Sequence, residues 1–221
     1  MEKVIKIKSI IPRTHDVRSY RCERPEGYHF IPGQATDVSI NKDGWKDEKR
    51  PFTFTSLNDD EYLEFTIKSY TDHEGVTNQL YQLKEGDELI IRDVWGAIEY
   101  KGPGYFIAGG AGITPFIAIL RQLKKDGRLE DNQLFFSNKT DRDIISEDEF
   151  NSMLGDKVTH VITHDPSTRY YAGRIDEAFL KEKVKDFRRH FYLCGPDPMV
   201  QAMQQILSKL GASPDAVVFE K

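Results

Sequence analysis

The sequence predicts two domains of different architecture: a Greek-key antiparallel β-barrel over residues 1–101, and an α/β domain with a doubly wound parallel sheet over residues 102–221. Three observations carry this prediction. The first half consists of short runs rich in β-branched and aromatic residues, separated by turn residues. The second half alternates β-rich runs with helical patterns. Between them, Gly and Pro crowd together in EYKGPG, residues 99–104.

The first half reads as six strands and one helix. Several of the strands alternate apolar and polar residues, and closing them into a barrel would leave few exposed edges. The helix precedes the turn KEGD. The expected strands are 3–11, 17–23, 35–40, 50–56, 62–70 and 87–94, and the expected helix is 76–83.

The second half reads as five strands and four helices. Thr114 is expected to cap the first helix, with Pro115 at its first position, and Ser146 is expected to cap the second. The expected strands are 104–110, 132–138, 157–163, 190–195 and 216–221, and the expected helices are 113–127, 146–154, 175–184 and 197–211.

Composition narrows the class of protein. The net charge is -5, and residues 1–100 hold 14 Lys and Arg against 19 Asp and Glu, so neither half has the basic excess of a nucleic-acid binder. No apolar run approaches the ~20 residues of a membrane span, and the N-terminus lacks the apolar segment of a signal peptide. We therefore expect a cytoplasmic protein without a membrane partner.

Metal-binding patterns are weak in this chain. Two cysteines, Cys22 and Cys194, are too few for a disulfide framework or a four-sulfur site. His160 and His164 have a ligand-like spacing, but they lie on an expected strand with no third ligand nearby in the sequence. The prediction is a protein without a metal site.

A glycine-rich turn joins the first strand of the second half to its helix. FIAGGAGITP, residues 106–115, places three glycines at this junction. Glycines let a diphosphate approach the backbone, and a helix N-terminus supplies free N–H groups. The pattern G-G-x-G-x-x-P departs from G-x-G-x-x-G, and a tight turn without a ligand is the alternative.

Two segments of the first half also suit a phosphate-bearing ligand. In RPFTFTS, residues 50–56, Arg50 could pair with a phosphate, and an aromatic side chain could lie against a flat cofactor. In GVT, residues 75–77, a helix begins and offers free N–H groups. The alternatives are an ordinary amphipathic strand and a helix that Thr77 merely caps.

Five motifs together carry a resemblance to a known family. The chain resembles the ferredoxin–NADP(H) reductase superfamily of flavin-dependent oxidoreductases over nearly its whole length, and lacks the Cys cluster of members with an iron–sulfur domain. The motifs, in family order, are FIPGQ (30–34), RPFT (50–53), GVT (75–77), GGAGITP (109–115) and CGPDPM (194–199).

The resemblance implies roles for individual residues. Thr53 would face flavin N5, and Cys194 would lie near nicotinamide C4, so these two are the residues expected at the chemistry. The residues implied in flavin binding are Arg50, Pro51, Phe52, Thr53, Ile67, Lys68, Gly75, Val76 and Thr77, and those implied in coenzyme binding are Gly110, Gly112, Thr114, Cys194, Gly195 and Pro196. Many members end in an aromatic that covers the flavin; here the nearest aromatic is Phe219, and the ring is expected to be more open unless the chain is cut.

The resemblance implies an NAD(P)H-dependent reductase that passes hydride to bound FAD, then electrons to a separate acceptor such as a small redox protein. A reductase that uses flavin as a substrate, and an electron-transfer subunit of a larger complex, are the alternatives. FAD is favoured over FMN by the family majority and by the separate turn 75–77. Asn138, Lys139 and Arg142, with Asp141 between them, follow the second parallel strand, and the two cations slightly favour NADPH over NADH.

The thiol of Cys194 has four readings from the residues, and two of them fail. A metal ligand lacks co-ligands, and a dithiol partner would have to be Cys22 in the other half. An inert strand-end thiol remains open. The fourth reading is a small, soft contact at the carboxyl end of a parallel strand, where such sheets bind ligands.

Overall fold

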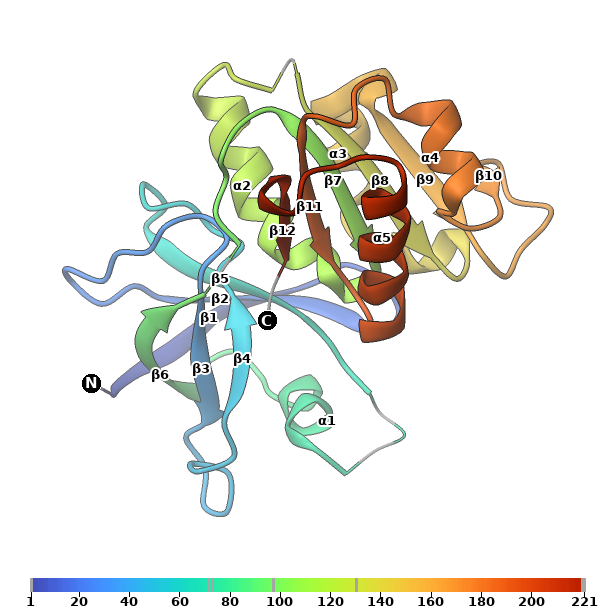
Figure 1. The fold of residues 1–221 in the computed structure, drawn as a ribbon. Coiled ribbons are helices and arrows are strands. Elements are labelled where there is room, and N and C mark those ends of the chain that lie inside the picture. Colours follow the sequence, from blue (N-terminus) through green and yellow to red (C-terminus); the bar gives the residue numbers. More distant parts are fainter. Residues whose placement is uncertain (1, 71, 73, 97, 130, 220–221) are drawn as a thin grey trace.

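A computed structural model describes residues 2–70, 72, 74–96, 98–129 and 131–219, and it confirms the two-domain architecture (Figure 1). One six-stranded sheet belongs to the N-terminal half and a second to the C-terminal half. The predicted boundary between residues 101 and 102 falls in the segment between the last strand of the first sheet and the first strand of the second, and it stays a prediction.

The N-terminal sheet is antiparallel, with the order β4-β3-β6-β1-β2-β5. A bridge between Phe54, just past β4, and Phe65 on β5 joins its two outer strands, so the sheet curls into a barrel. The barrel encloses a core in which Phe54 stacks on Phe30. Its elements are β1 (Lys3–Pro12), β2 (Val17–Glu23), β3 (Ala35–Ile40), β4 (Arg50–Thr53), β5 (Tyr62–Lys68), α1 (Val76–Tyr81) and β6 (Glu88–Trp95).

The C-terminal sheet is parallel, with the order β10-β9-β8-β7-β11-β12. The chain starts at β7 in the middle, winds outward through β8 and β9, and returns to β11 on the other side of β7. Its strands are β7 (Gly104–Gly109), β8 (Gln133–Asn138), β9 (Val158–Ile162), β10 (Tyr171–Ala172), β11 (His190–Cys194) and β12 (Val217–Phe219). The winding direction reverses between β7 and β11, where doubly wound sheets bind ligands at the carboxyl ends of their strands.

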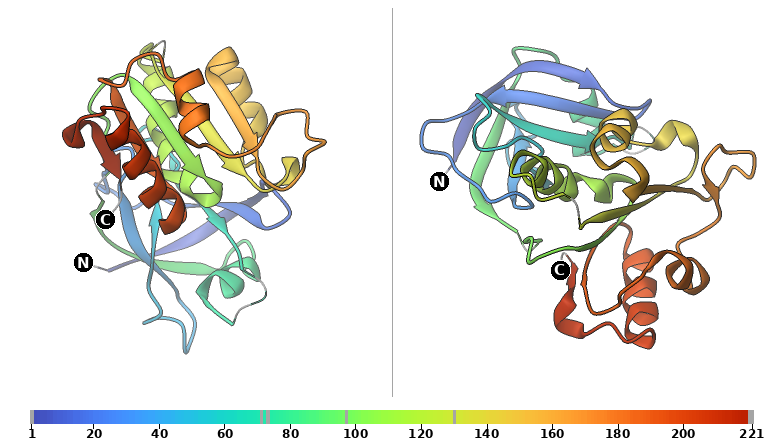
Figure 2. Two further views of the ribbon diagram at one scale, coloured as in Figure 1. Left: turned by 45° about the vertical axis from the view of Figure 1, so that its right-hand side comes forward. Right: turned by 90° about the horizontal axis from the view of Figure 1, so that it is seen from above.

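Helices cover both faces of the parallel sheet (Figures 1 and 2). They are α2 (Thr114–Lys125), α3 (Glu147–Leu154), α4 (Glu177–Lys183) and α5 (Asp197–Lys209). Successive strand residues serve opposite faces: Phe106 packs in one core with α2 and α3, whereas Tyr105 packs in the other with α4 and α5. Helix α2 is the one that lies beside the barrel.

One predicted helix cap is wrong, and the other is right in position only. A 3₁₀ turn, Gly110–Ile113, precedes α2, so Thr114 is already helical and donates to the carbonyl of Ala111 at 3.0 Å. Ser146 stands at the cap position of α3 with φ of 54°, and its side chain makes no capping hydrogen bond. Short β10 was not predicted, because two residues are too few to show a period. Within the described part of the chain, none of the helices combines the length and apolar character of a membrane span.

Candidate functional site

A cavity of about 1190 Å³ lies between the barrel and the carboxyl edge of the parallel sheet. Residues of β4 and β5 line its barrel side, and the turns after β7 and β11 line the opposite side. Twelve of the predicted site residues line it: Pro51, Phe52, Thr53, Ile67, Lys68, Thr77, Gly110, Gly112, Thr114, Cys194, Gly195 and Pro196. The fold therefore brings segments from the whole length of the chain to one place.

Four predicted residues lie outside this lining. Arg50 is exposed, donates to the carbonyl of Lys49 at 2.6 Å and pairs with Glu48 at 3.7 Å. Val76 is buried in the barrel core, and Gly75 precedes it at the start of α1. Phe219 packs against the core beneath α5. Their assignment to a cofactor stays a prediction.

The two domains meet at a pair of threonines in the cavity wall. The hydroxyl of Thr53 on β4 donates to the hydroxyl oxygen of Thr114 at 2.9 Å, and Thr114 in turn donates to the carbonyl of Ala111. This chain of hydroxyls connects the barrel strand to the glycine turn. A ligand atom beside Thr53 would therefore lie next to the turn that begins α2.

The glycine turn has no room for side chains where it meets the turn after β11. A Cβ on Gly112 would lie 2.3 Å from the carbonyl oxygen of Cys194, and a Cβ on Gly109 would lie 2.5 Å from the sulfur of Met199. Gly110, in contrast, has open space around it and a φ of 52°, which favours glycine. The G-G-x-G pattern thus follows from close contact between two loops and one left-handed turn.

Coenzyme binding is supported by an amide on the cavity wall. Asn138, at the end of β8, is 5% exposed and lines the cavity, and neither polar atom of its side chain has a hydrogen-bond partner among the residues that the structure describes. Buried amides are nearly always hydrogen-bonded, so a bound molecule with donor and acceptor groups is expected here. The open backbone at Gly110 and this amide together fit a dinucleotide.

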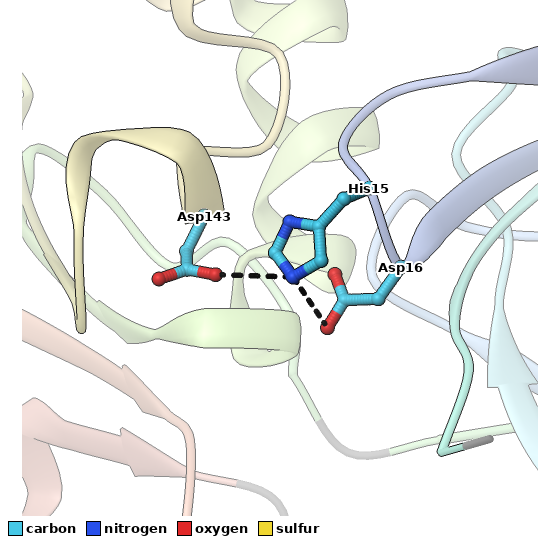
Figure 3. Close-up of side chains that lie close together, drawn as sticks. All are labelled: His15, Asp16 and Asp143. Carbon is cyan, nitrogen blue, oxygen red and sulfur yellow. Dashed lines mark ion pairs between the residues drawn. The ribbon is translucent and has the colours of Figure 1, made fainter.

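An ion-pair cluster bridges the domains (Figure 3), and its member Asp143 lines the cavity. His15, from the barrel, lies with its Nε2 3.7 Å from Asp16 and 3.8 Å from Asp143 of the other domain. Lys68 Nζ lies 3.0 Å from the same oxygen of Asp16. Burial would raise the pKa of Asp16, but hydrogen bonds from Lys68 and Thr14 lower it. Lys68 already neutralises the charge of Asp16. We therefore interpret the cluster as an electrostatic contact between the two domains.

Each histidine of the H-x3-H pair has its own environment. His160 is buried on β9, where burial lowers its pKa and its Nε2 lies 2.9 Å from the amide oxygen of Asn151. His164 lines the cavity and shares a hydrogen bond with Thr163. The two thiols differ in location. Cys22 is buried, and burial raises its pKa to about 12, whereas Cys194 is partly buried and lines the cavity.

Several lining residues were missed by sequence reasoning. Tyr70 and Trp95 are large exposed aromatics in the cavity wall, at the ends of barrel strands. The exposure of these two side chains is what marks them as cavity residues, and no periodic pattern in the sequence reveals it. Arg174 follows the unpredicted strand β10, and only strand pairing brings it to the cavity.

This fold and this cavity define a class of protein: a barrel joined to a doubly wound domain, with glycine loops at the switch point facing the barrel. A family model described as oxidoreductase NAD-binding domain matches residues 106–205. NADH-cytochrome b5 reductase 1 of Aspergillus terreus is 30% identical over 233 residues, covering 94% of this chain and 77% of that protein. The propane 2-monooxygenase reductase component of Rhodococcus jostii is 27% identical over 234 residues. The match covers 98% of this chain but only 62% of the length of that relative.

Solved structures share the whole fold. The CS-b5R domains of human Ncb5or match with a TM-score of 0.88 at 23% identity, covering 100% of this chain and 70% of that one. A ferredoxin NADP+ reductase from Neisseria gonorrhoeae, solved with FAD and NADP, matches with a TM-score of 0.87 at 19% identity, covering 99% and 98%. The chain belongs to the ferredoxin–NADP(H) reductase superfamily of FAD- and NAD(P)-binding reductases, as its motifs indicated.

Proposed function

We propose that this chain is an NAD(P)H-dependent, FAD-containing reductase that passes electrons to a separate acceptor. The observation that carries the proposal is the cavity between the domains, where the β4–β5 wall of the barrel faces two glycine loops of the α/β domain. Such a cavity can hold two flat ring systems against each other. Family membership supports the same conclusion.

The chain's own residues would supply binding and alignment. When bound, flavin and NAD(P)H supply the redox chemistry, with a hydride leaving the coenzyme and both of its electrons entering the flavin. Phe52 would support the flavin ring, and Thr53 would hold a hydrogen bond at its reacting edge. Gly110 and Gly112 would let the coenzyme diphosphate reach the backbone at the start of α2. Alignment of the reacting atoms is the main contribution of the protein.

FAD, rather than FMN, is the flavin we propose. Thr77 on α1 lines the cavity on the barrel side and extends the lining beyond β4 and β5, which supports a second phosphate contact. Mass spectrometry of the cofactor released by heat would reveal FMN if the proposal is wrong.

The function is tested with the purified protein. We expect a yellow protein that oxidises NADPH or NADH with a dye as electron acceptor. A colourless protein that reduces added flavin would be a flavin reductase instead. A yellow protein without turnover would be an electron-transfer subunit.

The physiological acceptor in this proposal is a small redox protein. Relatives support it by name: one is an oxygenase reductase component, and others are NADH-cytochrome b5 reductases. Reduction of a ferredoxin, a flavodoxin or a cytochrome b5 by NAD(P)H, compared with free flavin and ferric chelates, would identify the acceptor class.

NADPH is the coenzyme that the cavity favours in this proposal. Lys139 and Arg174 line it without a side-chain partner among the described residues, and His164 lies between them. The strand register places these three residues in a row: Ile162 on β9 pairs with Asn138 on one side and Ala172 on the other, so all three follow adjacent strand ends. Cations there suit a 2′-phosphate. Arg142 is outside the cavity lining.

Replacing Arg174 or Lys139 by Gln is expected to raise KM for NADPH by about tenfold each and to leave KM for NADH nearly unchanged. A charge-assisted hydrogen bond contributes about 1.5–3 kcal/mol, which corresponds to at least this factor. Steady-state kinetics with both coenzymes is the measurement. Arg142→Gln is the matched control, and equal effects on both coenzymes would contradict NADPH selectivity at this row.

Cys194→Ala is expected to slow flavin reduction by about three- to tenfold, because a small change of alignment costs rate. The flavin content should not change, since Cys194 lies on the opposite side of the cavity from β4. Stopped-flow absorbance at saturating coenzyme measures the rate. Unchanged kinetics would mean that the thiol is only a strand-end packing residue.

A further inference from the structure

Helix α2 contacts the barrel through Thr114 at its start and through Arg121 further along, besides an exposed ion pair at its last residue. At its start, Thr114 receives the hydrogen bond from Thr53. Two turns further on, Arg121 reaches the barrel and donates to the carbonyl of Thr55 at 2.5 Å. Residues seven apart lie on one face of a helix, so the same face of α2 makes both contacts.

The guanidinium of Arg121 joins three segments at once. Its NH1 donates to a carboxylate oxygen of Glu64 on β5 at 2.8 Å, while its Nε and NH2 donate to the two oxygens of Glu149 on α3 at 2.5 and 2.9 Å. This arrangement uses the planar fork of arginine, which lysine cannot reproduce. Arg121 therefore ties the barrel to two helices of the coenzyme domain.

The contact between Arg121 and Glu64 is largely buried. The side chain of Glu64 is fully buried, and that of Arg121 is 19% exposed. Burial disfavours the charge of Arg121, yet Glu149 and Glu64 together raise its pKa. A second interdomain pair on α2, Lys125 with Asp59, is exposed on both sides and is of the kind that contributes little.

We propose that Arg121 is a positioning residue, which holds α2, and with it the glycine turn for the coenzyme, at a fixed distance from the flavin strand. It touches neither ring in this role. The inference rests on the proposed function, because it concerns the alignment of coenzyme and flavin. Its structural part, that Arg121 couples the two domains, can be tested without turnover.

The test compares Arg121→Met with Lys125→Met in the flavin-loaded protein. Arg121→Met is expected to lower the limiting rate of flavin reduction at saturating NADPH by about tenfold, since misplacement by an ångström can cost up to about a hundredfold. The long-wavelength charge-transfer absorbance of coenzyme against flavin should weaken in parallel, while flavin content stays the same. Lys125→Met should keep both near wild type. Arg121→Lys should recover only part of the rate.

Calorimetry separates the two proposals. The wild type is expected to unfold in one transition and Arg121→Met in two, because its domains are uncoupled. A wild type that oxidises neither coenzyme would overturn the proposed function, and the calorimetry would still decide the coupling. A single transition together with a wild-type reduction rate in Arg121→Met would overturn the positioning role. If Arg121→Met does not fold, Glu149→Gln, which weakens the same contact, should lower the rate about threefold; an unchanged rate would likewise overturn it.

Discussion

Gly112→Ala is expected to lower the rate of flavin reduction by NAD(P)H by about a hundredfold or more, while the flavin remains bound. The added Cβ would lie 2.3 Å from the carbonyl oxygen of Cys194, 2.4 Å from its carbonyl carbon and 2.6 Å from the backbone nitrogen of Gly195. All three are backbone atoms, so no rotamer change relieves the clash. The two loops must move apart, and misalignment of this size is costly.

The rate in Gly112→Ala is measured by stopped flow, alongside the flavin content. Gly211→Ala is the control for destabilisation, because Gly211 has a φ of 89° and open space around it, at the far end of α5. It should lose some stability but keep the reduction rate. A wild-type rate in Gly112→Ala would show that the contact of the two loops does not set the coenzyme position.

The two-domain fold and much of the cavity could be predicted because their signals are local. Glycine turns stand directly after apolar strands, and Thr53 follows Arg-Pro-Phe in a short alternating strand. Residues at the ends of adjacent parallel strands then meet at one edge without further information. Residues of four of the five predicted motifs therefore line the cavity even though they are spread along the chain, and the fifth motif, FIPGQ, lies outside the lining.

The remaining parts of the site depend on contacts that no local pattern contains. Arg174 reaches the cavity only because a two-residue strand pairs with β9. Glu64 alternates like any strand residue, but its partner Arg121 comes 57 residues later. The cap at Thr114 was mispredicted for a related reason: a 3₁₀ turn packed against the loop after β11 precedes Thr114, where local preference favours a cap.

Glu64→Ala is expected to lower the free energy of unfolding by about 3 kcal/mol at pH 7, near the lower end of the cost of breaking a buried ion pair. The carboxylate accepts hydrogen bonds from Arg121 at 2.8 Å and Arg21 at 3.0 Å, with Arg13 at 3.5 Å. Its removal leaves Arg121 with Glu149 as its remaining carboxylate partner and with the carbonyl of Thr55. The side chain of Arg21 is 36% exposed and can turn toward water, which limits the loss.

The same carboxylate should make stability depend on acid. Burial would raise the pKa of Glu64, but Arg121, Arg21 and Arg13 lower it below its ordinary value of 4.5. A carboxyl group with a lowered pKa in the folded state contributes stability above its unfolded pKa, and this contribution is lost as the pH falls through the folded value. The free energy of unfolding of the wild type, measured with urea, should therefore fall steadily below about pH 4.5.

Glu64→Gln, which keeps the shape and loses the charge, should remove this part of the acid dependence. Glu61→Ala, an exposed neighbour in the same sequence segment, should leave both the stability and its pH profile unchanged. If Glu64→Gln matched the wild type in its loss of stability between pH 4.5 and 3, the arginines would not be stabilising an ionised Glu64. Such a result would locate the acid sensitivity in other carboxylates, such as Asp16, whose pKa is also lowered in the folded chain.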